Sequence, residues 1–574
     1  MTRRRRKRIE KQCRHAEVKG RPSGARRVTA GAGITLGATL VIAGTAQATE
    51  FTVNTAGDSG GNCDATPTTC TLRQAINSAN ASSGLDDIVF DSGLTGSTII
   101  FGEEPPQIMG PTTITGLGAG QLAVDGNGEH KIFDINLSTA PGAVLISDLT
   151  VQNGCCAGGI RSANADLSVS DAVITANEAI GRGAGISSSG PSLTVERSTV
   201  SGNTQTGGNP GGGIYAYYEL TLTDSTISDN TAGTDGGGVY VGLSYSFGGT
   251  DQHSGPHLIE NSTIVGNTAG ANGGGVNFCG SAFEADLLTI ESSTISGNDA
   301  AGTAAAGGGY GGGVANYCGP GYSGAILKNT IVAGNTAAAA DPDINADSPV
   351  SASFSLIQID TGGITEGVTG SNVTGVDPLL LVLANNGGPS QTQALAETSP
   401  VVDQGTTTLT SDQRGEPRPF DVPEIDDSTA TGANSSDIGA FERQSDDPTT
   451  KVLSISAGGT GSSAVTGPGI NCSGAAPDCT QPFNTGAAPS LTATASAGSV
   501  FAGWSGCDSP SGNQCTMNID ADKSVTATFN ALPASGGSPP PPASSGPTGR
   551  RAAAMKKCKK KPKGPKRKKC IKRA

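Results

Sequence analysis

Residues 211–230 read GGGIYAYYELTLTDSTISDN, and the second half of this stretch is one copy of a phrase that occurs seven times. The copies, between Asp148 and Asn335, are DLTVQN, DAVITAN, RSTVSGN, DSTISDN, NSTIVGN, SSTISGN and NTIVAGN. Each copy ends on an asparagine, and the intervals between these asparagines are 24, 26, 27, 37, 31 and 37 residues. Repetition with this period is typical of solenoids and propellers, in which each unit buries its apolar face against its neighbours.

The repeated unit contains strand-like stretches and no helical pattern. In residues 211–230, Ile214, the LTLT run and the STIS run are short β-branched stretches separated by turn formers. Three strands in about 25 residues fit one coil of a parallel β-helix better than a propeller blade of about 40 residues. The sequence therefore predicts an all-β fold, a right-handed parallel β-helix of the pectin-lyase-like type. The alternative is a low-complexity segment without a fixed fold, which the periodic Ile and Val disfavour.

The repeated asparagines predict a ladder inside the solenoid. Stacked coils place equivalent residues about 4.8 Å apart, so each side-chain amide can bond to the next. The predicted ladder comprises Asn153, Asn177, Asn203, Asn230, Asn267, Asn298 and Asn335. Glycine clusters such as Gly211–Gly213 fit corners where the backbone turns with positive φ.

Charge is distributed unevenly along the chain. The formal net charge is −13, but 12 of the 37 Lys and Arg lie in residues 1–27 and 14 lie in residues 550–573. The residues between hold the other 11, against 48 of the 50 Asp and Glu, which is a net charge of −37. An anionic body with a cationic tail bears on partners and solubility and not on fold.

Residues 1–48 are typical of an export signal. A basic stretch ends at Arg27, an uncharged stretch follows, and Ala46-Gln47-Ala48 is a small-x-small cleavage site. The uncharged stretch is too short for a confident membrane span, and no later stretch is apolar enough to cross a bilayer. We expect a secreted, extracellular protein associated with the cell envelope, with no transmembrane segment after signal cleavage.

Cysteine usage agrees with an oxidising compartment. Beyond Cys13 in the signal, most cysteines form close pairs, from which we expect the disulfides Cys63 with Cys70, Cys472 with Cys479, and Cys507 with Cys515. Cys279 and Cys318 follow Gly-Val in neighbouring coils, so stacking predicts a bridge between them. The pairing of Cys155, Cys156, Cys558 and Cys570 stays open. Zinc is the alternative, but the chain has no CxxC and only 4 histidines. We predict no metal and no cofactor.

Residues 49–110 are expected to cap the N-terminal end of the solenoid. TLRQAINSAN predicts a helix with Thr71 and Gln74 as a capping box and an apolar stripe of Leu72, Ala75, Ile76 and Ala79. FTVNTAGD, CTLRQAINSAN and DDIVF together resemble the start of bacterial surface proteins with a CSLREA signature. The signature stands here as CTLRQA, residues 70–75, with Thr for Ser and Gln for Glu.

Residues 111–340 are the predicted β-helix, and residues 341–445 are expected to be its second cap. Within the latter, DPDI, VDPLLLVLANNGGPSQTQALAETSPVVDQG, SDQRGEPRP and DIGAFE follow one another. This order resembles the choice-of-anchor module found behind β-helices in exported bacterial proteins. The two resemblances imply display outside the cell and supply no catalytic motif.

Residues 450–530 show alternating strand patterns and resemble a divergent internalin-type B repeat, a small β domain. Trp504, the only tryptophan, is expected in its core. Residues 531–549 are a linker rich in Pro, Gly and Ser. Residues 550–574 are a cationic tail, expected to be disordered and suited to anionic polymers.

Catalytic motifs are not evident in the repeats. Glycan cleavage needs paired carboxylates on neighbouring coils, or a basic residue beside calcium ligands. The aspartates of the repeats stand where turn formers are expected, and fold alone does not decide function.

All 8 tyrosines lie between residues 215 and 322. Three successive coils lengthen the loop after the glycine strand, at residues 242–257, 279–286 and 317–324, and insertions in successive repeats stack on one face. The candidate ligand-binding residues in these loops are Tyr245, Phe247, Phe283, Tyr317 and Tyr322. Packing of the loops against the solenoid wall is the alternative.

The sequence thus predicts an adhesin-like binding or structural module at the cell surface, with a glycan or a surface protein as ligand. The alternative is a polysaccharide-active enzyme, a lyase or a glycoside hydrolase. We expect the basic tail to bind anionic polymers of the cell envelope. Nucleic acid is not an expected partner, because an exported protein meets wall polymers first.

Overall fold

The computed structural model describes residues 48–532 except 64–68, 139–141, 243–255, 281–286, 304–307, 317–323, 347–348, 362 and 474–478, together with residue 559. The export signal and nearly all of the linker and basic tail therefore lie outside the described residues. The chain divides into two compact units at Thr450 and Lys451, with Pro482–Asn484 assigned to the first.

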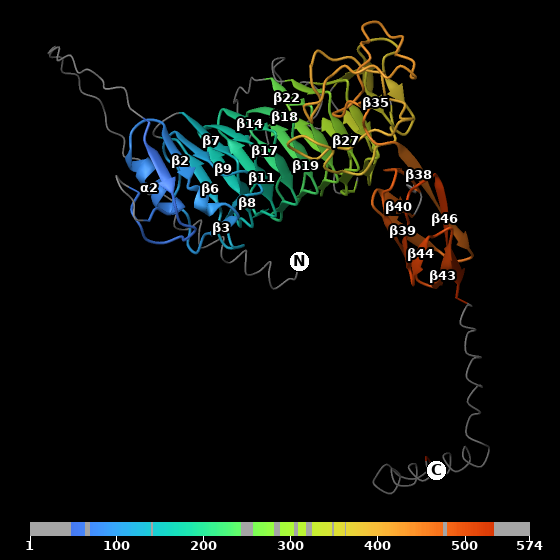
Figure 1. Ribbon diagram of the computed structural model, residues 1–574, viewed down its shortest axis with the longest axis horizontal. Coiled ribbons are helices and arrows are strands. Elements are labelled where there is room, and N and C mark those ends of the chain that lie inside the picture. Colours follow the sequence, from blue (N-terminus) through green and yellow to red (C-terminus); the bar gives the residue numbers. More distant parts are fainter. Residues whose placement is uncertain are drawn as a thin grey trace, which may run out of the picture. The chain divides into compact units, whose positions relative to one another are not determined.

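The first unit is a solenoid of parallel strands that stack coil upon coil in chain order (Figure 1). Sheet A comprises β1 Glu50–Val53, β2 Asp86–Phe90, β4 Thr112–Thr115, β7 Ala143–Ser147, β10 Asp166–Ser170, β14 Ser192–Glu196, β18 Glu219–Thr223, β22 His257–Glu260, β26 Leu288–Glu291, β30 Ala325–Lys328, β34 Val350–Ser353 and β36 Ile364–Glu366. Sheet B comprises β3 Ser97–Ile100, β5 Leu122–Asp125, β8 Thr150–Gln152, β11 Val173–Thr175, β15 Thr199–Ser201, β19 Thr226–Ser228, β23 Thr263–Val265, β27 Thr294–Ser296, β31 Ile331–Ala333, β35 Leu356–Ile357 and β37 Val373–Thr374.

Two further sheets, with 8 and 6 strands, complete the coils in the middle of the solenoid. Sheet C comprises β6 Phe133–Asn136, β9 Ile160–Ala163, β13 Ile186–Ser189, β17 Ile214–Ala216, β21 Val239–Gly242, β25 Val276–Cys279, β29 Val314–Asn316 and β33 Ile344–Ala346. Sheet D comprises the two-residue strands β12 Glu178–Ala179, β16 Thr204–Gln205, β20 Thr231–Ala232, β24 Thr268–Ala269, β28 Asp299–Ala300 and β32 Thr336–Ala337. The all-β parallel β-helix predicted from the sequence is confirmed, with one more short strand per coil than expected.

The corners of each coil explain which residues repeat. Between sheets A and B one residue takes a left-handed conformation, as Asp224 does with φ 49°, and a second does so before each ladder asparagine, as Asp229 does with φ 56°. The glycine clusters stand where coils approach most closely. A Cβ on Gly212 would lie 2.3 Å from Gly237 O, and one on Gly237 would lie 2.4 Å from Gly274 O. Side chains are therefore excluded from this corner.

Alternation along each strand sends aliphatic side chains inward. Leu220 and Leu222 of β18, Ile227 of β19 and Ile214 of β17 are fully buried and belong to one continuous core. Stacking of coils buries this core along the whole solenoid axis, because no single coil can enclose its own apolar face.

The N-terminal end is closed by the predicted helix, α2 Leu72–Ala81, which packs against β1 and β2. Thr71 is its N-cap and accepts from Gln74 N at 3.2 Å, and Leu72, Ala75, Ile76 and Ala79 are buried. A short 3₁₀ turn, η1 Ser92–Leu94, follows β2.

Arg73 ties the cap together. Its guanidinium donates to both carboxylate oxygens of Asp58 at 2.9 Å and to the carbonyls of Glu103 and Glu104 at 2.8 and 2.6 Å. The Cys63–Cys70 disulfide closes the loop before the helix.

Residues 341–376, expected in the second cap, begin by continuing the solenoid through β33 to β37. The following residues, 378–447, are here named the cover segment. They run along the outer face of sheet B rather than forming strands of the solenoid (Figure 1). Asn261 Nδ2 donates to Ser411 O at 3.0 Å, Thr263 Oγ1 donates to Gln413 Oε1 at 2.6 Å, and Asn329 Nδ2 donates to Asp437 O at 2.8 Å. The segment thus shields the outer threonines of β19, β23 and β27.

Strands β38 to β46 form two sheets. One has the order β41 Thr480–Asn484, β38 Thr450–Gly459, β46 Lys523–Ala531 and β43 Ser499–Ser505, and the other has the order β40 Ile470–Cys472, β39 Ser463–Gly467, β42 Ser490–Ala495, β45 Gln514–Thr516 and β44 Ser509–Ser511. Phe529 is fully buried, and Phe501 packs edge-on against both Phe529 and Trp504.

Within the residues that the structure describes, none of the helices has the length and apolarity that crossing a bilayer requires.

Candidate functional site

The asparagine ladder runs through the interior of the solenoid. Each side-chain amide donates to the side-chain oxygen of the next asparagine at 2.9 or 3.0 Å, in the order Asn177, Asn203, Asn230, Asn267, Asn298 and Asn335. Each amide also donates to a carbonyl of the preceding coil, as Asn230 does to Val200 O at 2.9 Å. Because the ladder ties each coil to the next at a constant level, the outer faces of the solenoid are regular.

Asn153 lies outside this ladder, contrary to the prediction. Val151 pairs with Ile174, so Gly154 stands opposite Asn177 and its N–H donates to Asn177 Oδ1 at 2.8 Å. Asn153 occupies the preceding corner with φ 54°, and its Nδ2 donates to Asp125 Oδ2 at 2.7 Å. In the first copy of the phrase the asparagine stands one residue before the position that is equivalent to Asn177. It therefore cannot join the ladder.

At its other end the ladder stops on a carboxylate. Asn335 Nδ2 donates to Asp343 Oδ1 at 2.9 Å, and Asp343 Oδ2 accepts from Ile359 N at 2.7 Å. Asp343 stands at the level of Gly313, where a Cβ would lie 2.8 Å from Asn335 Nδ2. The next coil begins with LIQIDT at residues 356–361 and has no asparagine at the equivalent position, which leaves room for the carboxylate. Burial raises the pKa of Asp343 to about 6.

A second ladder, of serines, lies at the corner between sheets A and B. Ser225 Oγ accepts from Ser198 N at 3.0 Å, and Ser262 Oγ accepts from Ser225 N at 3.2 Å. Each hydroxyl donates to the carbonyl two residues before it, as Ser225 does to Thr223 O at 2.7 Å. This ladder was not predicted, although its signal is the serine that precedes threonine in RSTV, DSTI, NSTI and SSTI.

The outer face of sheet A carries two in-register rows of side chains, in which hydroxyl groups are the most frequent. One in-register row contains Thr113, Leu145, Ser168, Thr194, Thr221, Leu258, Thr289, Ile326 and Ser351. The parallel row contains Thr115, Ser147, Ser170, Glu196, Thr223, Glu260, Glu291, Lys328 and Ser353. Successive residues of a row lie about 4.8 Å apart along the solenoid. This face therefore suits a ligand that is itself extended.

Two carboxylates are neighbours in the second row. Glu260 of β22 stands in register with Glu291 of β26, and Glu291 Oε2 lies 3.8 Å from Lys328 Nζ. Burial raises the pKa of Glu260, and the charges of Glu291 and Asp224 raise it further. Sequence reasoning missed this pair because 31 residues and an inserted loop separate its members.

All five predicted ligand-binding residues, Tyr245, Phe247, Phe283, Tyr317 and Tyr322, lie outside the described residues. Two of the described tyrosines, Tyr215 and Tyr240, lie on strands β17 and β21 of sheet C. Tyr215 and Tyr240 stack with ring centroids 5.5 Å apart on the outer side of sheet C, and both are almost fully buried. Arg182 lies over the Tyr215 ring at 5.2 Å. These two tyrosines pack and offer no open ring face.

The disulfides Cys63–Cys70, Cys472–Cys479 and Cys507–Cys515 are present at the predicted pairs. Cys279 also takes part in a disulfide. Its predicted partner, Cys318, lies outside the described residues.

Two motifs interlock in the cover segment. SDQRGEPRP supplies Asp412, Arg414 and Arg418, and DIGAFE supplies Asp437 and Glu442. Arg414 Nε donates to Asp412 Oδ2 at 2.8 Å, and Arg418 Nε donates to Glu442 Oε2 at 2.7 Å, with all four side chains nearly inaccessible. Glu442 Oε2 also accepts from Asp437 N at 2.9 Å. These five charged residues of the two motifs thus belong to one buried network.

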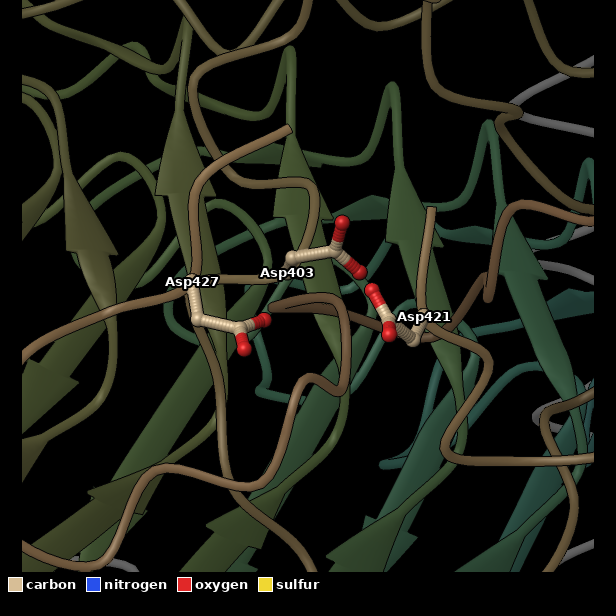
Figure 2. A group of neighbouring side chains, drawn as sticks. All are labelled: Asp403, Asp421 and Asp427. Atoms are coloured by element: carbon tan, nitrogen blue, oxygen red, sulfur yellow. The ribbon is translucent and has the colours of Figure 1, made fainter. Parts of the chain in front are cut away.

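A group of three carboxylates lies beside this network. Oxygen atoms of Asp403, Asp421 and Asp427 lie within 4.8 Å of one another, with Asp403 buried and the other two exposed. Figure 2 shows Asp403 between Asp421 and Asp427, all on irregular loops. Acidic groups this close share protons or bind a hard cation such as Ca²⁺. Burial raises the pKa of Asp403 to about 7, and the neighbouring acids contribute.

The two sheets of the second unit carry a sequence signature of their own. Residues 454–533 match the family model of the divergent InlB B-repeat domain. This match agrees with the resemblance seen in the sequence and with the strands β38 to β46.

The comparisons add little on the first unit. A crystal structure of the pectate lyase Pel9A is similar, with 14% sequence identity and a TM-score of 0.35, over 70% of this chain and 98% of the lyase. At that identity and TM-score the likeness says nothing about activity. No curated protein matches the chain.

Proposed function

We propose that this protein is exported and that its β-helix is a binding or structural module at the cell surface, with a glycan or a surface protein as ligand. The observation that carries the proposal is the outer face of sheet A. It is long, its residues are in register from coil to coil, and hydroxyls are its most frequent side chains, as expected of a surface that meets an extended partner through repeated contacts.

Export is supported at the start of the chain. The first strand, β1, begins at Glu50, two residues after the proposed cleavage site at Ala48. Disulfides hold both units, which fits an oxidising compartment. In this proposal residues 49–110 are a CSLREA-type cap, and residues 341–445 are a choice-of-anchor module whose two motifs form the buried network of the cover segment.

A pocket beside β1 and α2, at the N-terminal end of the solenoid, contains no side chain suited to catalysis. It is lined by Thr49, Phe51, Asn77, Ser78, Ala81 and Ser82. None of these side chains can act as an acid or a base near neutral pH.

The test is a glycan and protein array probed with the mature protein, residues 49–574. In one variant Thr194→Arg and Thr221→Arg place bulky side chains on the outer face of sheet A. In a matched variant Thr204→Arg and Thr231→Arg do the same on the outer side of sheet D, where the threonines are also half-buried. We expect ligands found on the array to be lost by the first variant and kept by the second. Equal binding by both would exclude sheet A as the binding face.

A second function, cleavage of a polysaccharide, is favoured by Glu260 and Glu291. Paired carboxylates with different environments are the arrangement that glycosidases use as acid and base. Incubation with uronate polymers and plant glycans, followed by assays for reducing ends and unsaturated products, tests this function. Products that disappear with Glu260→Gln would establish it and displace the binding proposal.

A further inference from the structure

Part of the outer face of sheet B is covered by an extended stretch of the chain itself. Thr226 Oγ1 of β19 donates to Gln391 O, and two coils further on Ser296 Oγ of β27 donates to Gln393 Oε1. Residues 391–393 therefore run along the solenoid axis and cross the strands of sheet B.

This covering stretch matches the residues beneath it in polarity. The two glutamines lie over hydroxyls, and Gln413 of the cover segment likewise accepts from Thr263 Oγ1 at 2.6 Å. One coil beyond β27, Leu395 packs in a cluster with Ile331 and Ala333 of β31. The outer face of sheet B thus binds a polypeptide through hydroxyls that donate to carbonyl and carboxamide oxygens, with aliphatic contacts beside them.

The same face continues in register beyond the point that the cover segment reaches. Hydrogen bonds between the cover segment and the described part of the solenoid begin at Asp224, directly before β19. In the preceding strand, β15, Thr199 stands in register with Thr226, and Ser201 stands in register with Ser228. Both side chains of β15 are half-buried and point outward. The hydroxyls that hold the cover segment are therefore repeated where it does not reach.

This continuation, here named the open face, extends over five strands, which is about 20 Å or the length of about six residues of extended chain. Its side chains, from β15 back to β3, are Thr199, Ser201, Val173, Thr175, Thr150, Gln152, Ala123, Asp125, Thr98 and Ile100. Asp125 is the single charged residue among these ten, and it is buried and accepts from the amides of Gln152 and Asn153. The open face therefore presents hydroxyl and aliphatic groups without an exposed charge.

We propose that the open face binds an extended, uncharged polypeptide segment of a partner protein, which lies along the solenoid axis as residues 390–395 do. Carbonyl and carboxamide oxygens of the partner accept from Thr199 and Ser201, and its aliphatic side chains pack on Val173. Ser201 Oγ donates to Thr175 Oγ1 at 3.3 Å, a bond long enough to be exchanged for one to the partner.

The chemistry of the partner is inferred from the segment that occupies the rest of the same face. That occupant is a polypeptide, its contacts are amides over hydroxyls and Leu395 over aliphatic residues, and the rows beneath it are continuous with those of the open face. The open face is on sheet B, so this interaction is separate from binding of a ligand to sheet A.

The experiment uses a peptide with the sequence of residues 389–396, PSQTQALA, with a benzophenone group at its N-terminus. The peptide is irradiated with the mature protein, residues 49–574, and the cross-linked residues are mapped by mass spectrometry. We expect cross-links on β11 and β15. A peptide with alanine in place of both glutamines should label these strands about tenfold less, because it lacks two side-chain acceptors.

Variants of one coil make the result specific. Thr199→Arg combined with Ser201→Arg obstructs the open face and should lose the cross-links. Thr194→Arg places the same side chain on sheet A of that coil and should keep them. Melting temperatures measured by circular dichroism identify a variant that does not fold, and in that case the single substitution Thr175→Lys replaces the double variant on the open face.

Several results would overturn the proposal. These are the absence of cross-links on β11 and β15, equal labelling of sheets A and B, equal labelling by the peptide without glutamines, and labelling that the open-face variants leave unchanged. A glycan whose binding is lost only in the open-face variants would assign the face to carbohydrate. A dimer in sedimentation experiments that these variants alone dissociate would assign it to a second copy of the chain.

Discussion

Asn230 makes four side-chain hydrogen bonds at a position with no exposed surface. Its amide donates to Asn267 Oδ1 and to Val200 O, and its oxygen accepts from the backbone and the side chain of Asn203. A buried amide costs free energy unless its groups are paired. The ladder satisfies each amide only because equivalent residues on both sides do the same.

Replacing Asn230 with Leu should destabilise the solenoid. The substitution nearly keeps the volume but leaves Asn203 without its acceptor, at an expected cost of about 1–3 kcal/mol per unsatisfied group. Thermal unfolding followed by calorimetry measures the change. Thr231→Val is the control, because Thr231 is next in the chain and its side chain is half-buried on the outer side. A melting temperature of Asn230→Leu equal to that of the control would contradict the ladder.

Asp343 makes the end of the ladder sensitive to pH. Its carboxyl is buried and its pKa is raised from 3.8 to about 6 by that burial. The folded state therefore gains stability from this group at pH values below 3.8 and loses that gain as the pH rises through about 6.

The Asp343→Asn variant should remove this dependence while keeping an oxygen for the Asn335 amide. A pKa shift of about two units corresponds to roughly 3 kcal/mol at most. Unfolding by urea at several pH values between about 4 and 8 gives the measurement. The natural protein should lose stability relative to the variant as the pH rises, and parallel profiles would show that Asp343 does not titrate there.

At the scale of elements, the two ends of the first unit are held by arginines in different ways. At the N-terminal cap Arg73 spans three segments, because it reaches Asp58, Glu103 and Glu104 from the first turn of α2. In the cover segment Arg414 and Arg418 join two motifs, since each binds Glu442, which lies 28 and 24 residues away in sequence. Both arrangements use the planar fork of the guanidinium, which an ammonium cannot reproduce.

Arg73→Lys should loosen the N-terminal cap. Lysine keeps the charge but cannot bind both oxygens of Asp58 and two carbonyls at once, so we expect a loss of about 1–3 kcal/mol. Arg161→Lys is the matched control, since Arg161 makes one bond to Asp134 and its side chain is 49% exposed, which predicts about 0–1 kcal/mol. Hydrogen exchange of residues 50–62 and calorimetry both report the change. Similar losses for the two variants would mean that the fork geometry is unimportant.

At the scale of the whole molecule, the reversal of charge between body and tail needs a reason. Residues 550–573 carry 14 Lys and Arg, whereas the body has a net charge of −37. A polyanionic wall would repel the body alone. We propose that the tail holds the protein to anionic polymers of the envelope.

Retention on isolated cell walls tests the tail. The intact mature protein should be retained at low salt, and a form ending at Gly549 should not. Retention should fall as salt shortens the Debye length from about 10 Å at 0.1 M to about 3 Å at 1 M. Equal retention of the two forms at low salt would exclude the tail as the attachment.

The sequence by itself was sufficient for the solenoid, the capping helix and the B-repeat domain. These features depend on local periodicity: Ile and Val at fixed offsets, an apolar stripe in residues 72–79, and alternation in residues 450–530. Each coil repeats the same pattern of apolar and polar residues, so the pattern of one unit predicts the structure of its neighbours.

Only the tertiary structure decided which residues of neighbouring coils and of the cover segment lie next to one another. Register removed Asn153 from the ladder and placed Asp343 at its end, since a shift of one residue at a corner cannot be seen in the phrase itself. Stacking brought Glu260 beside Glu291, and folding of the cover segment brought Asp403 beside Asp421 and Asp427. Such contacts join residues separated by loops of irregular length, whose geometry is determined by packing and not by local preference.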